Sequence, residues 1–246
     1  MAVLALVSVV AFLPPLLVLY LPDGLFSRHP HRFAEMINRW WAVISTWPLL
    51  RVSVTGLERL GRPGQGEQDA SNALDLARPP SRVYVCNHSS ALDIFIALRA
   101  LPGFKFISKS SVFLIPFVGW AMFLTGHVRL RRTDRKSQVA CLKECARLLR
   151  RGSSLLLFPE GTRSRDGRLQ PYKKGAFSLA AKAGCPVVPV TIRGASSLLP
   201  RNAPWLFFPG VVDVMVHDPI PPGDPEKMAE QAWKATHAAL VGEGGA

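Results

Sequence analysis

Acidic residues are scarce in this sequence. Only 17 Asp and Glu stand against 30 Lys and Arg, which gives a net charge of +13 over 246 residues. A balance of this kind favours an anionic partner: nucleic acid, an anionic membrane surface or a phosphate-bearing substrate. Cysteine is also rare. The four cysteines form no C-x-x-C pair and no ligand set, so we expect no metal site and a reducing compartment, with Cys86 and Cys185 as buried free thiols.

Several motifs of common enzyme and binding classes are missing. No G-x-S-x-G nucleophile elbow occurs, which argues against a serine hydrolase, and Ser89 and Ser90 are better interpreted as helix caps. No P-loop or zinc pattern occurs. Nucleic-acid binding would explain the positive charge but not the uncharged N-terminal residues. We therefore expect no nucleic-acid partner.

Charge is absent from residues 2–21, which are almost entirely apolar. Twenty such residues, at ~1.5 Å rise each, can cross a hydrocarbon core of ~30 Å. Two consecutive prolines would kink such a helix, so a shallow or re-entrant insertion is the alternative to a spanning one. A signal peptide fits less well, because no basic residue precedes the run and no A-x-A-like site follows it.

A second candidate membrane element covers residues 32–50. Large apolar side chains recur there at helical spacing, and three of them are tryptophans: Phe33, Met36, Ile37, Trp40, Trp41, Ile44 and Trp47. Such a helix suits a membrane interface, or else packs on the protein. Arginines follow the uncharged run. We therefore predict membrane-anchoring helices over 1–50, and the positive-inside bias places the rest of the chain on the cytoplasmic face of the inner (plasma) membrane.

Strand and helix patterns alternate through residues 51–246, and a Gly- and Pro-rich loop insertion interrupts them at 61–80. The apolar strands and the amphipathic helices between them predict an α/β domain with a mixed, mostly parallel sheet flanked by helices. We expect a strand and turn at 50–60, further strands at 82–86, 104–108, 127–131, 154–158, 186–194 and 211–217, and helices at 90–101, 134–152, 173–184 and 225–242.

The stretch CNHSSALDIF places a histidine and an aspartate five positions apart after the strand at 82–86. His88 then lies at the carboxyl end of a strand, where open α/β sheets bind ligands. We expect Asp93 about a turn and a half into the next helix, with its carboxylate on one imidazole nitrogen. That contact would raise the basicity of the other nitrogen. The alternative is a helix cap and a surface acid.

Two stretches suggest an anion site. In LLLFPEGTRSRDG (155–167), proline and glycine end a buried strand and free backbone amides, to which Thr162 and Arg163 add donors. In GHVRLRRTDRK (126–136), five basic residues crowd together. The alternative interpretation of the first stretch is a solvated loop, and that of the second is a solvated basic face.

Pro189 interrupts the apolar strand CPVVPVTI. A bent edge strand at this point would line an acyl channel. Plain core is the other interpretation.

Together these blocks resemble the glycerolipid acyltransferase family, which includes the 1-acylglycerol-3-phosphate acyltransferases. NHSSALD carries the family's N-H-x-x-x-x-D motif, and residues 158–164 match F-P-E-G-T-R-S at every position. GHVRLRR places Arg132 on the family arginine, VVPVTI matches the fourth block, and ISKSSVFLIPFVGW fits the stretch that carries Lys109. The likeness covers roughly residues 80–220. Arg129 and Arg131 replace an aromatic or apolar residue and an acid of the family pattern.

The resemblance implies transfer of a fatty acyl group from acyl-CoA or acyl-carrier protein to the hydroxyl of 1-acylglycerol-3-phosphate, giving phosphatidic acid. Other acceptors are the alternative: glycerol-3-phosphate, another lysophospholipid or a lyso-aminolipid. A non-enzymatic membrane-binding protein is a further one. Lysophospholipid and membrane lipid are the expected partners, and no cofactor or metal is implied. Acyl-chain length and oligomeric state are left open.

The resemblance also assigns roles to residues. His88 is the general base and Asp93 orients it. The acceptor phosphate is bound by arginine, and the neighbouring residues shape its pocket: Arg163, Arg132, Glu160, Gly161, Thr162 and Lys109. Pro189 is the candidate for the acyl channel.

Overall fold

The computed structural model describes residues 30–61, 81–115, 119, 122–123, 125–131, 134–164, 167–200, 202–203 and 205–242. Two compact units make up the chain. The first comprises residues 1–53, 89–141 and 194–212, and the second comprises 54–88, 142–193 and 213–246. The predicted membrane run at 2–21 and nearly all of the predicted loop insertion lie outside the described residues. Among the residues that are described, none of the helices has the length and apolar character to cross a bilayer.

The second unit is built around a short, fully buried strand, β2 (Val83–Cys86). β5 (Ser154–Leu157) and β6 (Val187–Arg193) pair with β2 in parallel on either side, and β7 (Gly210–Val216) pairs antiparallel with β6. The continuous apolar sequence of β2 fits this place, because a strand with partners on both edges and cover on both faces contacts no water.

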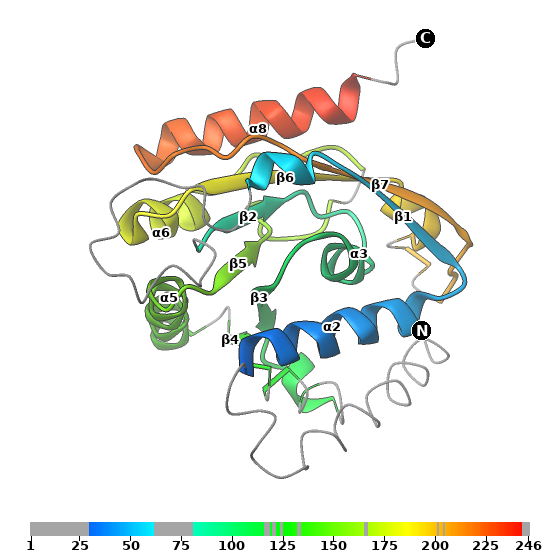
Figure 1. The fold of residues 1–246 in the computed structure, drawn as a ribbon, viewed down its shortest axis with the longest axis horizontal. Helices are drawn as coiled ribbons and strands as arrows, with labels where there is room; N and C mark the ends of the chain where they lie inside the picture. The colour runs from blue at the N-terminus through cyan, green and yellow to red at the C-terminus, as the bar shows by residue number, and fades with distance from the viewer. Residues whose placement is uncertain are drawn as a thin grey trace. The chain divides into compact units, whose positions relative to one another are not determined.

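Helices of the second unit cover its strands. α8 (Pro225–Val241) lies along β6, as Figure 1 shows, and also packs on α6 (Gly175–Ala183). α6 ends where predicted, since Gly184 adopts φ +67° and its N–H bonds back to the last turn. Asp224 caps α8 by accepting the N–H of Lys227. The 3₁₀ turn η1 (Leu57–Leu60) belongs to the same unit.

The prediction of an edge strand at Pro189 is wrong. β6 has β2 on one side and β7 on the other, so Pro189 does not lie on an edge strand. Pro189 is paired with Val85 and buried, and its carbonyl accepts the N–H of His217 at 3.0 Å. Proline lacks only the donor, so its carbonyl still serves the sheet. The acyl channel at Pro189 stays a prediction.

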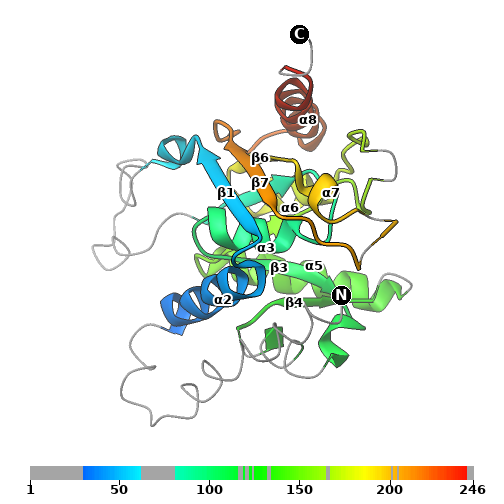
Figure 2. The ribbon, with the colours of Figure 1, turned by 90° about the vertical axis from the view of Figure 1, so that its right-hand side faces the viewer.

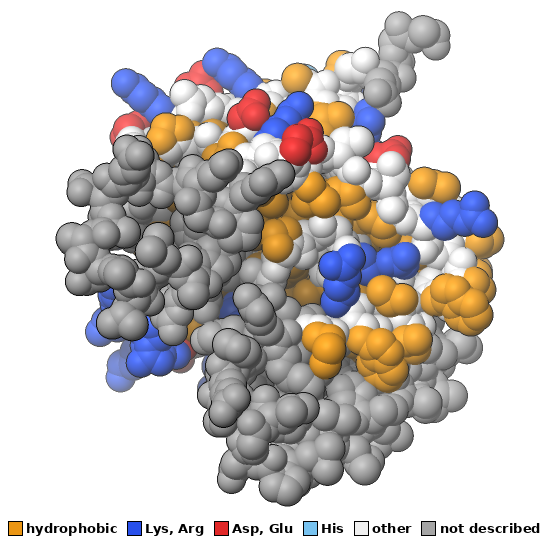
Figure 3. All heavy atoms as spheres, in the orientation of Figure 1, with side chains coloured by type: hydrophobic (Ala, Val, Ile, Leu, Met, Phe, Trp, Pro, Cys, Tyr) orange, Lys and Arg blue, Asp and Glu red, His pale blue; other side chains and the backbone are white. Residues whose placement is uncertain are grey.

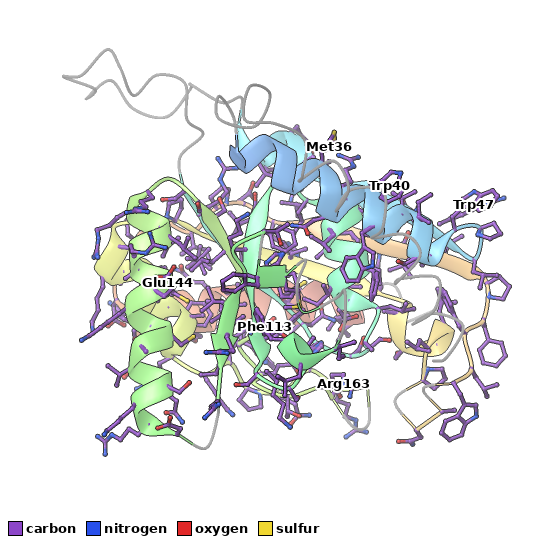
Figure 4. All side chains as sticks on the ribbon, turned by 90° about the horizontal axis from the view of Figure 1, so that it is seen from below. Met36, Trp40, Trp47, Phe113, Glu144 and Arg163 are labelled. Atoms are coloured by element: carbon purple, nitrogen blue, oxygen red, sulfur yellow. The ribbon has the colours of Figure 1, made fainter. Side chains whose placement is uncertain are left out.

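In the first unit, helix α2 (Pro30–Thr46) packs against α3 (Asp93–Ala100), and the two helices lie side by side in Figure 2. Trp41 is 6% exposed and its ring lies 4.7 Å from that of Phe95. Trp40 on the helix and Trp47 directly after its end are exposed, at 37% and 72%, and both are labelled in Figure 4. A helix is therefore present where one was predicted, but it ends at Thr46, before Trp47. The prediction of three tryptophans on one side of it is wrong, because Trp41 is packed on the protein and Trp40 is exposed.

The remaining elements of the first unit are short. β3 (Phe104–Lys109) pairs in parallel with β4 (Val128–Leu130). The turns η2 (Val112–Leu114) and α7 (Ala195–Leu198) were not expected from the sequence. β1 (Leu50–Thr55) and α5 (Arg135–Arg150) each contribute residues to both units. Seven strands, mostly parallel, occur among the described residues and are flanked by helices. The predicted mixed α/β class is confirmed.

Candidate active site

Asn87 fixes the chain directly after β2. Its side-chain Nδ2 donates to the Ile192 carbonyl at 2.9 Å, and its Oδ1 accepts the Ile192 N–H at 2.8 Å. The side chain is 6% exposed and offers β6 one donor and one acceptor, as a paired backbone would. No role of Asn87 was predicted from the sequence. The sequence feature that could have indicated a role is its position between Cys86, the last buried residue of a strand, and His88.

His88 is held by the F-P-E-G-T-R-S segment. Its backbone N–H donates to Glu160 Oε1 at 2.6 Å, and its carbonyl accepts the N–H of Ser164 at 2.8 Å. The imidazole stacks on the Phe158 ring, with 4.0 Å between ring centroids and 16° between the ring planes. Two motifs about seventy residues apart in sequence therefore meet at His88, and three contacts fix its backbone and its ring.

The carboxylate of Glu160 serves the backbone on two sides. Oε1 accepts from His88, and Oε2 accepts the N–H of Gln170 at 3.1 Å. Glu160 is only 3% exposed. A buried carboxylate needs such donors, because its desolvation is costly without them. The geometry gives Glu160 a task in positioning His88. Its predicted contact with substrate stays a prediction.

Gly161 makes the turn after Glu160 possible. Its φ is +76°, a left-handed conformation that glycine adopts without strain, and its N–H donates to the Phe158 carbonyl at 3.0 Å. A Cβ at this position would lie 2.8 Å from Lys173 Nζ. Thr162 is exposed and Arg163, which is labelled in Figure 4, is half-buried.

Asp93 belongs to the first unit, where it is the first residue of α3 and fully buried. Oδ2 accepts the N–H groups of Ser89 and Ser90, at 2.8 and 2.9 Å. The prediction that Asp93 lies a turn and a half into the helix is wrong. His88 belongs to the second unit, and the hydrogen bond expected between its ring and Asp93 stays a prediction.

The serines do not cap α3 as expected. The residue before the helix is Leu92, and no side chain caps it. The Ser90 hydroxyl donates to the Leu199 carbonyl at 2.9 Å and accepts the N–H of Leu92 at 3.3 Å. The carboxylate of Asp93 binds the amides of this loop instead, and it lies at the helix end where negative charge is favourable.

Lys109 is exposed at the end of β3, and Arg132 lies outside the described residues. All four cysteines are free and buried, as the sequence indicated for Cys86 and Cys185. No described group of three or more His, Cys, Asp or Glu side chains is placed to hold a metal ion.

More than half of the chain is similar to one known protein family. Residues 51–193 match the family model described as Acyltransferase. The chain belongs to the acyltransferase family. The matched region contains His88, Asp93 and the whole F-P-E-G-T-R-S segment, so the contacts described above for His88, Glu160 and Asp93 lie within the part of the chain that the family shares.

Relatives of this acyltransferase carry a more specific name. A 1-acyl-sn-glycerol-3-phosphate acyltransferase of Chlamydomonas reinhardtii is 43% identical over 88% of the chain and 60% of the relative. A chloroplastic one of Brassica napus is 43% identical over 80% and 53%. The chain thus spans little more than half the length of these relatives.

A solved structure also resembles the chain. The crystal structure of the 1-acyl-sn-glycerophosphate acyltransferase of Thermotoga maritima has a TM-score of 0.76 at 25% identity, over 98% of this chain and 96% of that one. This likeness agrees with the α/β class and extends beyond the 143 residues that the family model matches at positions 51–193.

Proposed function

We propose that the protein transfers a fatty acyl group from an acyl thioester to the free hydroxyl of 1-acylglycerol-3-phosphate, giving phosphatidic acid. The observation that carries the proposal is the attachment of His88 to the F-P-E-G-T-R-S turn through Glu160, Ser164 and Phe158. It brings a titratable base to a turn that ends in Arg163. The names of the relatives support the acceptor.

The chemistry needs one base and no covalent intermediate, because a thioester is already activated. The acceptor oxygen attacks the thioester carbonyl, an ester C–O bond forms, and the C–S bond breaks. His88 takes the hydroxyl proton and returns it to the leaving thiolate of acyl-CoA or acyl-carrier protein. Asp93 orients the ring and stabilises the imidazolium. A buried carboxylate held by two backbone amides keeps a fixed position for that task.

The phosphate of the acceptor would meet cations at the turn. Arg163 offers a guanidinium fork that matches phosphate geometry, and Thr162 adds a hydroxyl donor. Arg132 and Lys109 are the further cations that the family resemblance assigns. This set favours an acceptor with a phosphate over a neutral glyceride.

Membrane attachment on the cytoplasmic face fits this substrate, since both lysolipid and product reside in a bilayer. Large exposed apolar side chains are numerous in the first unit: Met36, Trp40, Ile44, Trp47, Leu49, Leu114, Ile115, Phe123, Trp205, Leu206 and Phe208. Figure 3 shows hydrophobic side chains beside Lys and Arg on one face of the molecule. Tryptophan and basic residues together are typical of surfaces that meet anionic lipid.

A product assay tests the proposal. Purified protein receives a panel of acceptors, lysophosphatidate, glycerol-3-phosphate, other lysophospholipids and monoacylglycerol, with acyl-CoA or acyl-carrier protein as donor. Mass spectrometry identifies the product. We expect phosphatidic acid from lysophosphatidate, and a loss of about 10²–10⁴-fold in His88→Ala, the usual contribution of a general base. Near wild-type turnover in a folded His88→Ala variant, or preference for a neutral acceptor, would contradict the proposal.

A further inference from the structure

Two adjacent lysines precede α6 and differ in their surroundings. Lys174 forms an ion pair with Glu226 on α8, and both side chains are about two-thirds exposed. Lys173 extends in another direction and lies over Gly161. Its Nζ is 2.8 Å from the point where a Gly161 Cβ would stand, and its Cδ and Cε are 3.4 Å from that point. Only one of the two ammonium groups therefore reaches the turn that follows Glu160.

The backbone fixes this placement. The N–H of Lys173 donates to the Pro159 carbonyl at 3.0 Å, and the N–H of Gln170 donates to Glu160 Oε2. The segment before α6 is thus bound at two points to the turn that also holds His88. Lys173 therefore lies beside the turn at Gly161, although it is outside the F-P-E-G-T-R-S motif in the sequence.

We propose that the Lys173 ammonium is a phosphate-binding group of the acceptor site, acting beside Arg163; this inference rests on the function proposed above. Among the residues that the structure describes, no carboxylate forms an ion pair with Lys173, whereas Lys174 is paired. An ammonium is a compact charge with three donors and binds phosphate from any side.

Gly161 leaves room for the Lys173 ammonium beside the turn. Without a side chain at this position, the ammonium lies directly against the turn. A phosphate at the turn would then meet Lys173 and Arg163 together. A dianion held by two cations of different geometry combines charge with orientation. The positive φ explains why glycine is needed for the turn, and a Cβ at this position would in addition displace the end of the flexible Lys173 side chain.

The test compares Lys173→Met with Lys174→Met in the full-length protein. For Lys173→Met we expect the KM for lysophosphatidate to rise about 10- to 100-fold, which corresponds to about 1.4–2.8 kcal/mol. The kcat and the KM for the acyl donor should change less than about threefold, and Lys173→Arg should recover most of the affinity. Lys174→Met should match the wild type in all these constants.

A structural task for Lys173 would give a different result. If the ammonium only balances the charge of Glu160, Lys173→Met lowers stability or kcat and leaves the acceptor KM unchanged. That outcome overturns the inference, as does an equal effect of the two lysine variants. Activity on monoacylglycerol, which lacks phosphate, separates the cases further. Loss of a phosphate contact leaves it unchanged, and loss of a structural contact lowers it.

A second pair of variants addresses Gly161. Gly161→Ala and Gly167→Ala both place a Cβ on a left-handed residue, at φ +76° and +78°, but nothing lies within 4 Å of the latter. The backbone strain is therefore similar, and only Gly161→Ala displaces Lys173. We expect a raised acceptor KM in Gly161→Ala alone. Equal KM values in the two variants would count against the contact.

Binding of glycerol-3-phosphate, measured by calorimetry, separates this inference from the proposed function. If the wild type acylates no lysolipid, the proposed function fails. Weaker glycerol-3-phosphate binding by Lys173→Met than by Lys174→Met then still supports a phosphate site. No binding by the wild type, or equal binding by the two variants, overturns the phosphate site itself.

Discussion

Glu160 offers the sharpest test of how the site is built, because one substitution changes its hydrogen bonds without changing its shape. The carboxylate accepts the backbone N–H of His88 through Oε1 and that of Gln170 through Oε2. Glu160→Gln keeps one acceptor oxygen and replaces the other with an NH₂ group, which itself donates. One buried backbone donor therefore loses its acceptor in either orientation of the amide.

The magnitude follows from these two bonds. A buried donor left without an acceptor costs about 1–3 kcal/mol. The bond that survives changes from a charged to a neutral acceptor, which lowers its contribution by about 1 kcal/mol. We therefore expect Glu160→Gln to lower the free energy of unfolding by about 2–4 kcal/mol, measured by urea denaturation. The matched control is Glu226→Gln, since Glu226 is 67% exposed and its ion pair with Lys174 should contribute at most about 1 kcal/mol.

Kinetics of the folded variant separate positioning from substrate binding. A shift of about 1 Å in a catalytic group can cost about 10²-fold in rate. If Glu160 positions His88, kcat falls at least about tenfold and the acceptor KM changes less than about threefold. If instead kcat is retained and the acceptor KM rises, Glu160 contacts substrate as the family resemblance implies, and the reasoning from its backbone hydrogen bonds is wrong.

Two further predictions concern Asn87 and His127, to which the proposed reaction assigns no contact with substrate. Asn87→Ala should lower the free energy of unfolding by about 2–4 kcal/mol, because the N–H and the carbonyl of Ile192 both lose a buried partner. The control is Asn202→Ala, since Asn202 is exposed. Equal urea midpoints of the two variants would contradict the role of Asn87 in bridging to β6. Burial, and then the charge of Lys105, holds the pKa of His127 well below its ordinary value, so the unfolded chain takes up the proton first as pH falls. The stability from neutral His127 is therefore complete above about pH 6.5 and declines below it by up to about 1.4 kcal/mol per pH unit. Urea midpoints from pH 7.5 to 5 should show this decline in the wild type and a shallower one in His127→Gln; identical slopes would refute it.

Much of the fold follows from local sequence. β2 and β5 are uninterrupted apolar runs bounded by turn residues, and such runs predict strands buried on both faces. The end of α6 follows in the same way, because Gly184 is the residue that a left-handed helix end requires. These features depend on neighbours within a few positions, which the sequence displays directly.

The start of α3 could not be predicted in that way. Serines before a helix favour capping, yet the Ser90 hydroxyl is bound to the Leu199 carbonyl, 109 positions away in sequence. The carboxylate of Asp93 instead accepts the backbone N–H groups of Ser89 and Ser90. The position of β6 between two strands is a similar case, since an internal proline suggests an edge and only the pairing with β7 shows otherwise. Long-range partners decided both features.

The motif residues also divide by the kind of group that they bind, which the sequence alone does not reveal. Asn87 and Glu160 direct their polar atoms at backbone amides and carbonyls, although both belong to blocks that the resemblance associates with substrate. A polar residue in a motif is therefore consistent with two physical tasks, contacting the substrate or fixing the position of the residue that does. The proposed mechanism moves one proton from a lipid hydroxyl to a thiolate, and it needs few contacting residues but tight control of one imidazole, since distance governs proton transfer. On this view, mutations at Asn87 or Glu160 act on kcat through His88, whereas those at Lys173 or Arg163 act on acceptor affinity.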